Sequence, residues 1–318
     1  MNLAKIEAAA ARLAGAARAT PLLEAPLLSA RAGKRVLVKA ECLQVTGSFK
    51  FRGAWAAVSA LPAETRGVLA YSSGNHGQGV ALAAARHGLP CVVVMPSDAP
   101  EVKAANTRAF GAEVVLYDRQ HEDRDAIGAR LCAERGLALI KPFDDAEVIA
   151  GQGSVGLEIA AQARALGVEQ GEVLVCCGGG GLSAGIALAL EAHAPGLRLR
   201  TVEPAGFDDM ARSLAAGERL RNAQGTGSVC DAILTPSPGE LTFPVLQRLA
   251  GAGIAVSDDQ ALEAMALAFT HLRIVLEPGG AVALAAALKA ETHDPVICVA
   301  SGGNVDPGLF RDVVARFG

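Results

Sequence analysis

Short apolar runs alternate with longer alanine-rich stretches along most of the chain. GVLAYSS, PCVVVMP and AEVVLYD are apolar runs, whereas GQGVALAAARHG and EVKAANTRAFG are longer stretches that each end in glycine. Continuous apolar runs of this length are typical of buried parallel strands, and a closing glycine is typical of a helix end. The pattern therefore predicts βαβ units, in which helices cover both faces of a parallel sheet.

The same alternation continues in the second half of the chain. EVLVCC, LRLRTVEP, AGIAVS and DPVICVAS are strand candidates separated by alanine-rich stretches, and Ser257 is a good cap for the helix that follows it. The fold class is therefore α/β, with two lobes that each contain a mainly parallel sheet. Ligands are expected in the crevice at the carboxyl ends of the strands.

The composition supports a globular protein and excludes several functions. The chain has 318 residues, 51% of them hydrophobic, and its mixed acidic and basic residues give a net charge of -4. This charge is unsuited to nucleic acid, and no apolar run reaches the roughly 18 residues of a membrane span. The seven cysteines form no C-x-x-C pair and lie mostly in apolar runs. We therefore expect reduced, buried thiols, a cytoplasmic location and a small-molecule partner.

The loop SSGNHG, residues 72–77, follows a predicted strand and precedes a predicted helix. The side chains of Ser72, Ser73, Asn75 and His76 cluster there, where free helix N–H groups and the helix dipole favour an anion. The loop is suited to a carboxylate or a phosphate. A capped turn explains the same residue types.

A glycine run follows the predicted strand VLVC, in the sequence CGGGGLSAG. Consecutive glycines that lead into a helix expose several backbone N–H groups, which is how proteins cradle a phosphate. The same residues also fit a loose G-x-G-x-x-A pattern through Gly179, Gly181 and Ala184, and Glu203 follows at the end of the next strand. A nicotinamide enzyme therefore remains an alternative at this point.

Two further features concern single side chains. Ser301 begins SGGNVD, directly after the apolar run VICVA, so its hydroxyl is expected at a strand end. Lys50 lies between Phe49 and Phe51 in TGSFKFRGA. Burial beside Phe49 would lower the pKa of the Lys50 amine and make it a usable nucleophile. An amine, a phosphate cradle, an anion loop and a polar group for a ring nitrogen together match the requirements of pyridoxal phosphate.

The chain resembles the threonine/serine dehydratases and serine racemases of the fold-type II pyridoxal phosphate enzymes. The resemblance covers nearly the whole chain and is carried by KAECLQVTGSFKFRGA, SSGNHGQGVALAA, PFDDAEVIAGQGSVGLEI, CGGGGLSAGIALA, VEPAGFDDMARSL and SGGNVD. It implies a two-lobed fold like that of the tryptophan synthase β chain. Residues 1–65 and 143–318 would form a large cofactor-binding domain, and residues 66–142 a small domain that closes over the substrate.

The resemblance also implies roles for individual residues. Lys50 would carry the cofactor as a Schiff base, Phe49 would pack against its ring, Asn75 would meet the ring hydroxyl and Ser301 the pyridine nitrogen. The phosphate would be held by Gly178, Gly179, Gly180, Gly181 and Leu182. The substrate would be held by Ser72, Ser73, Asn75 and His76, with Ser73 as a second acid or base. Glu203, the Phe207 carbonyl and Asp209 match a site for Mg²⁺ or Ca²⁺.

The activity that follows from the resemblance is β-elimination of water from L-threonine or L-serine, which gives a 2-oxo acid and ammonia. Serine racemase and threo-3-hydroxyaspartate dehydratase are alternatives of the same class, and a nicotinamide oxidoreductase or a non-catalytic amino-acid sensor are alternatives of other classes. His121 and Arg124 lie in a segment that can reach the substrate side chain in relatives, whereas Cys230 and Gly279 depart from the family pattern. Relatives commonly form homodimers, so a homodimer is expected.

Overall fold

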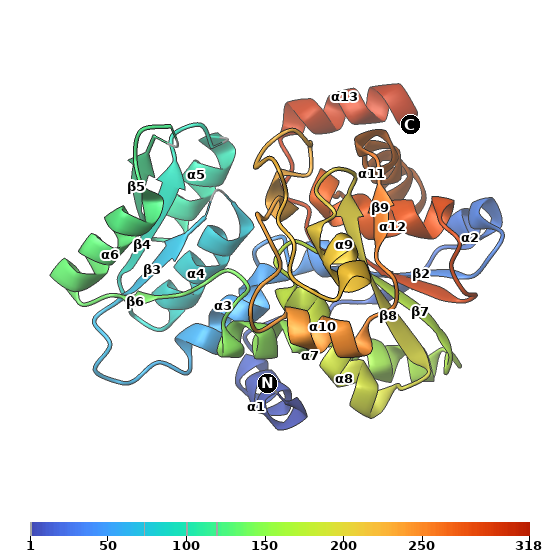
Figure 1. Ribbon diagram of the computed structural model, residues 1–318, viewed down its shortest axis with the longest axis horizontal. Coiled ribbons are helices and arrows are strands. Elements are labelled where there is room, and N and C mark those ends of the chain that lie inside the picture. Colours follow the sequence, from blue (N-terminus) through green and yellow to red (C-terminus); the bar gives the residue numbers. More distant parts are fainter. Residues whose placement is uncertain (1, 73, 100, 119) are drawn as a thin grey trace.

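The computed structural model describes residues 2–72, 74–99, 101–118 and 120–318. It contains two sheets, and Figure 1 shows the smaller one on the left. The larger sheet has six strands, parallel except for the edge pair β1 and β2. Their order across the sheet is β1 (Leu22–Glu24), β2 (Val36–Lys39), β10 (Val296–Val299), β7 (Gly171–Cys176), β8 (Leu197–Pro204) and β9 (Ile254–Val256).

The smaller sheet has four strands, all parallel. Their order is β5 (Glu113–Tyr117), β4 (Cys91–Pro96), β3 (Val68–Tyr71) and β6 (Ala138–Leu139). The predicted strands and the predicted α/β class are thus confirmed. All four strands fall inside the range 66–142, but the domain boundaries themselves stay a prediction.

Helices occupy most of the remaining chain. Those before β7 are α1 (Leu3–Leu13), α2 (Pro26–Ala32), α3 (Lys50–Val58), α4 (Asn75–Arg86), α5 (Glu101–Ala109), α6 (Arg124–Arg135) and α7 (Ala146–Ala165). Those after β7 are α8 (Gly181–His193), α9 (Asp209–Ala216), α10 (Phe243–Leu249), α11 (Asp258–Leu272), α12 (Pro278–Lys289) and α13 (Pro307–Phe317). Two short 3-10 helices are η1 (Glu41–Leu43) and η2 (Asp231–Ile233).

Each sheet is buried on both faces, which explains the continuous apolar runs of its strands. In the smaller sheet, Val93 and Met95 of β4 pack with α3, α4 and α5, whereas Val92 and Val94 pack with α6. Successive side chains of a strand point to opposite faces, so an uninterrupted apolar run fills both cores. Figure 1 likewise shows α12 on one side of the larger sheet, and α7 and α8 on the other.

The predicted helix ends are also found. Gly88 and Gly111 follow α4 and α5 with φ values of 68° and 93°, a backbone region that favours glycine. The Ser257 hydroxyl accepts a hydrogen bond from the backbone N–H of Gln260, and the Gln260 side chain bonds back, so α11 begins with a capping box. In the part of the chain that the structure describes, no helix is both long and apolar enough to cross a membrane.

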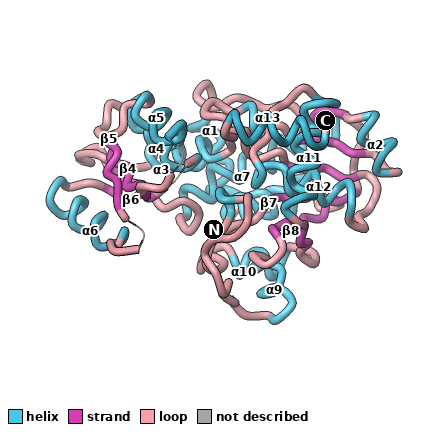
Figure 2. Tube along the Cα trace, turned by 90° about the horizontal axis from the view of Figure 1, so that it is seen from above, coloured by secondary structure: helices cyan, strands magenta, loops and turns pink. Residues whose placement is uncertain are grey.

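The two sheets lie side by side, and the chain passes between them at α3 and again before α7 (Figures 1 and 2). Strands β3, β7 and β10 end toward the same region between the sheets, where the loops that follow them line one cavity. This is the crevice that the α/β pattern predicts for a ligand.

Candidate active site

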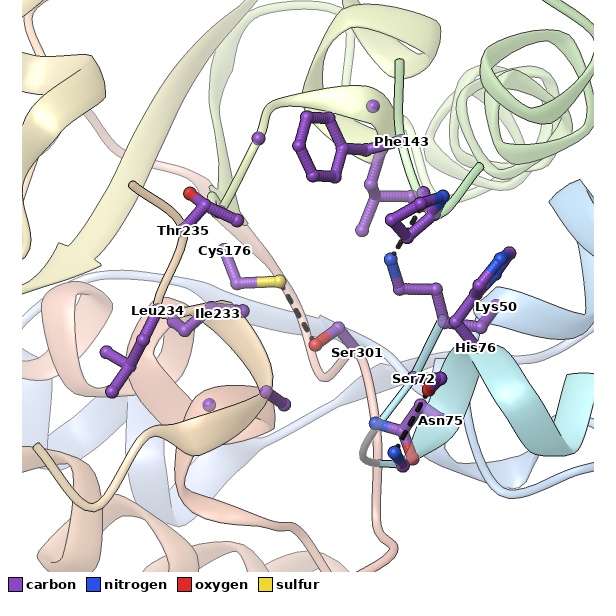
Figure 3. Close-up of a pocket in the computed structure, with 18 of the residues that line it drawn as sticks. Lys50, Ser72, Asn75, His76, Phe143, Cys176, Ile233, Leu234, Thr235 and Ser301 are labelled. Carbon is purple, nitrogen blue, oxygen red and sulfur yellow. Dashed lines mark hydrogen bonds between the residues drawn. The ribbon is translucent and has the colours of Figure 1, made fainter. Parts of the chain in front are cut away.

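A cavity of about 330 Å³ lies between the two sheets. Its walls come from the start of α3, the loop after β3, α5, the loop from β7 to α8, η2, the start of α12 and the loop after β10. Figure 3 shows Lys50, Asn75 and Ser301 around this space, with Phe143 and Thr235 on its far wall. The sequence-predicted Lys50, glycine run, anion loop and Ser301 are therefore brought together in one pocket.

Lys50 is the first residue of α3, and the fold fixes this helix end against the loop after β10. The backbone N–H of Phe49 donates to the Ser301 carbonyl at 3.0 Å. The Lys50 amine donates to the Pro142 carbonyl at 2.9 Å and lies 5.2 Å from the centre of the Phe49 ring. Burial lowers the pKa of Lys50 to about 8, although the nearby Cys176 and Glu277 act in the opposite direction. A lysine in this state supplies a neutral amine near physiological pH.

The glycine run ends strand β7 and starts α8. Its backbone N–H groups come before or within the first helical turn, where no intrahelical acceptor is available. A side chain on Gly179 would overlap the Phe143 ring, and a Cβ on Gly181 would lie 2.7 Å from the Gln152 Oε1 atom. The side-chain amide of Gln152 is buried and has no hydrogen-bond partner among the described residues. The orphaned amide and the glycine run fit a bound phosphate group.

Ser301 follows β10, with its hydroxyl at the strand end as the sequence predicts. The hydroxyl oxygen accepts a hydrogen bond from the Cys176 thiol at 3.1 Å (Figure 3). Both side chains are buried and line the cavity. The hydroxyl proton of Ser301 is left for an acceptor in the cavity, such as an aromatic ring nitrogen.

Asn75 begins α4 and is held on both sides. Its amide nitrogen donates to Glu277 Oε1 at 2.5 Å, and its carbonyl oxygen accepts from the Asn304 amide at 2.7 Å. Glu277 precedes Pro278 at the start of α12 and is buried. Burial raises its pKa to about 7, and the charge of Lys103 and the Asn75 bond partly offset this. The sequence analysis missed Glu277, whose only signal was a carboxylate directly before Pro-Gly-Gly.

The loop after β3 combines a turn with a neutral histidine. The Ser72 hydroxyl accepts from the Gly74 N–H at 3.0 Å, as in a capped turn. His76 bonds to the Ile140 carbonyl through Nε2 at 2.9 Å, which requires the proton on that nitrogen. Burial, with a smaller contribution from Lys50, lowers the pKa of His76 to about 3. The imidazole is therefore uncharged, and an anion here would rely on N–H and hydroxyl donors. Ser73 lies outside the described residues.

Charged side chains from both lobes meet at the cavity. Lys103 of α5 pairs with Asp231 of η2 at 2.7 Å, and the Arg124 guanidinium lies 5.1 Å from the centre of the Tyr71 ring. All four side chains line the cavity. His121 is instead exposed and bonded to Asp118, and it is not among the residues that line the cavity. Lys103 was not identified from the sequence, because α5 carries no motif.

The predicted cation site lies at the end of β8, away from the cavity. Glu203 accepts from the backbone N–H groups of Met210 and Ala211 at 2.9 and 2.8 Å. Both of its oxygens are thus bonded to α9, which argues against the ribose contact of the nicotinamide alternative. Burial raises the pKa of Asp209 to about 6, and its Oδ2 atom has no partner among the described residues.

The Asp209 charge disfavours a charge on Glu203: burial, followed by the Asp209 charge, raises the pKa of Glu203 well above its usual range. No cluster of three or more His, Cys, Asp or Glu side chains suited to a metal ion is found among the described residues. The predicted set contains only two such side chains, together with the Phe207 carbonyl. The unpartnered Asp209 oxygen and the effect of the Asp209 charge on Glu203 would fit a cation, and the site stays a prediction.

Comparison with known proteins identifies clear relatives. The profile of the family described as "Pyridoxal-phosphate dependent enzyme" matches residues 13–302. L-threo-3-hydroxyaspartate ammonia-lyase of Pseudomonas sp is 40% identical over 94% of this chain and 93% of its own length. Serine racemase of Oryza sativa subsp. indica is 36% identical over 97% of this chain and 92% of its own length. The crystal structure of a threonine deaminase from T.th. has a TM-score of 0.91 and 47% identity, covering 96% of this chain and 99% of that one.

Proposed function

Because the chain belongs to the family of pyridoxal-phosphate dependent enzymes and has their fold-type II architecture, we propose that it is an ammonia-lyase acting on a hydroxyamino acid. The proposed substrates are L-threonine and L-serine, and the products are a 2-oxo acid and ammonia. The observation that carries the proposal is the partly buried Lys50 amine, with its pKa of about 8, in one cavity with a glycine-lined helix start and the Ser301 hydroxyl.

When bound, pyridoxal phosphate supplies an electron sink that acidifies the α-hydrogen of an amino acid. The backbone N–H groups of residues 178–182 and the Gln152 amide would hold its phosphate, and Ser301 would donate to its ring nitrogen. Asn75, oriented by Glu277, would contact the ring hydroxyl. A serine donates a hydrogen bond without stabilising a positive ring as a carboxylate does. A serine at position 301 would therefore favour prompt loss of the substrate β-hydroxyl over a long lifetime of the negative charge left by the α-proton.

The proton steps would use Lys50. Its amine is neutral in a substantial fraction of molecules near pH 8 and would take the α-hydrogen as general base. His76 stays neutral, so it does not compete for this proton. Ser72 and the loop N–H groups would hold the substrate carboxylate next to the amine. By the resemblance to the racemases, Ser73 would be the second acid or base that permits racemisation.

A second candidate substrate is L-threo-3-hydroxyaspartate, and the Arg124 cation at the cavity favours it. Arg124 lines the cavity and could pair with a β-carboxylate in bidentate geometry. The Pseudomonas relative bears the corresponding name. Arg124→Met keeps an unbranched side chain and removes the guanidinium with its charge. If this arginine binds a β-carboxylate, the change raises KM for hydroxyaspartate and leaves KM for threonine nearly unchanged.

The decisive test of the activity is a product assay. The purified protein, loaded with pyridoxal phosphate, is incubated separately with L-threonine, L-serine and L-threo-3-hydroxyaspartate, while 2-oxo acid is measured by a coupled assay and the enantiomers of the remaining amino acid by chiral chromatography. Production of 2-oxo acid from threonine or serine supports the proposal. Accumulation of D-serine without 2-oxo acid would indicate a racemase and not an ammonia-lyase, and turnover of hydroxyaspartate alone would select the second candidate substrate.

A homodimer, which is common among relatives, is also proposed for this chain. The molar mass of the protein in solution, measured by light scattering, tests it.

A further inference from the structure

Cys176 is the residue that connects the end of β7 with the end of β10. Its side chain is buried at the last position of β7, two residues before the glycine run, and its thiol donates to the Ser301 hydroxyl at 3.1 Å. Figure 3 shows both side chains at the cavity, with the thiol and the hydroxyl next to each other. The two strands are neighbours in the sheet, so the contact joins adjacent strand ends.

The thiol keeps its proton under ordinary conditions. Burial raises the pKa of Cys176 to about 11, and the nearby charge of Lys50 offsets this only in part. A protonated thiol is a weak donor, and a thiolate would not donate at all. One acceptor position of the Ser301 oxygen is thus occupied by the thiol proton.

We propose that Cys176 is a positioning residue that fixes the direction of the Ser301 hydroxyl, so that this hydroxyl donates its own proton to the ring nitrogen of the cofactor. A serine hydroxyl can rotate and act as donor or acceptor. With the thiol proton directed at its oxygen, the hydroxyl proton points elsewhere, toward the cavity. Hydrogen bonds in such a chain also polarise one another, so the hydroxyl becomes a better donor. No proton is transferred and no bond is broken.

This inference rests on the proposed function, because it requires pyridoxal phosphate in the cavity. It predicts that Cys176→Val, which removes the donor and has one more side-chain heavy atom than cysteine, weakens cofactor affinity by between about twofold and tenfold, the range of one neutral hydrogen bond. It also predicts a change in the absorption maximum of the bound cofactor or in the pH dependence of that band. Ser301→Ala should change the same band in the same direction and to a larger extent.

The experiment measures cofactor dissociation constants and absorbance spectra for the wild type and the variants Cys176→Val, Cys176→Ala, Cys176→Ser and Ser301→Ala. Cys176→Ser restores an O–H donor and should recover the wild-type spectrum. Cys298→Val is the matched control, because this buried thiol on β10 bonds to the Leu37 carbonyl and does not line the cavity. If the valine variant does not fold, Cys176→Ala provides the same test, because it also removes the thiol donor.

A double-mutant cycle separates positioning from packing. If Cys176 acts through Ser301, Cys176→Val has no further effect on affinity or spectrum in the Ser301→Ala background. The proposal is overturned if Cys176→Val and Cys176→Ala both keep the wild-type spectrum and affinity, or if the valine change has its full effect without Ser301. A wild-type protein that gives no cofactor band would instead refute the proposed function.

Discussion

The capture of pyridoxal phosphate by Lys50 should have a pH dependence centred near 8. Only the neutral amine attacks the cofactor aldehyde, so the rate of capture follows the neutral fraction. With a pKa of about 8 in place of the usual 10.5, this fraction at pH 7 is roughly 300-fold larger than for an exposed lysine. The reason is burial, which disfavours the ammonium form more than Cys176 and Glu277 stabilise it.

The assay mixes cofactor-free protein with pyridoxal phosphate between pH 6 and pH 10 and follows the visible band in a stopped-flow instrument. The free aldehyde with N-acetyl-lysine is the reference reaction. Glu277→Gln removes a nearby negative charge that raises the pKa of Lys50, so its midpoint should fall below that of the wild type. A wild-type midpoint near 10 would refute the claim that burial activates this lysine. A midpoint that rises in Glu277→Gln would refute the assigned role of the carboxylate.

Three further changes have distinct expected results. Gly179→Ala should weaken cofactor affinity at least tenfold in a fluorescence titration, because the new Cβ would overlap the Phe143 ring at the phosphate cradle; unchanged affinity would contradict the cradle. Arg52 and Glu41 form a buried ion pair at 2.8 Å. Arg52→Ala should lower the free energy of unfolding in urea by about 3–5 kcal/mol, because it leaves Glu41 buried without its charged partner, and a loss below about 1 kcal/mol would contradict this role. Asp209→Asn should abolish any increase in thermal stability on adding Mg²⁺ or Ca²⁺, whereas an unchanged increase would place the cation elsewhere.

The sequence predicted the parts of the molecule that depend on local pattern. The apolar runs identified the strands because each buried parallel strand must be apolar on both faces. The glycine run, Lys50, Asn75 and Ser301 were found because their residue types follow strands or begin helices, and the fold brings such positions together.

Other parts of the site depend on tertiary contacts that no local pattern reveals. Glu277 is next to Asn75 although more than 200 positions separate them, and its raised pKa comes from burial among distant elements. Lys103 and Asp231 meet only because the two lobes face each other. Cys176 was recognised as a buried thiol, but its bond to Ser301 follows from the pairing of β7 with β10.

The measurement that tests the central claim most directly is the location of the cofactor on the chain. The protein is incubated with pyridoxal phosphate, reduced with borohydride and digested, and the modified peptide is sequenced by mass spectrometry. The account predicts a pyridoxyl group on Lys50 at one per chain, its loss in Lys50→Ala, and loss of 2-oxo acid production in the same variant. A label on another lysine, or full activity in Lys50→Ala, would contradict it.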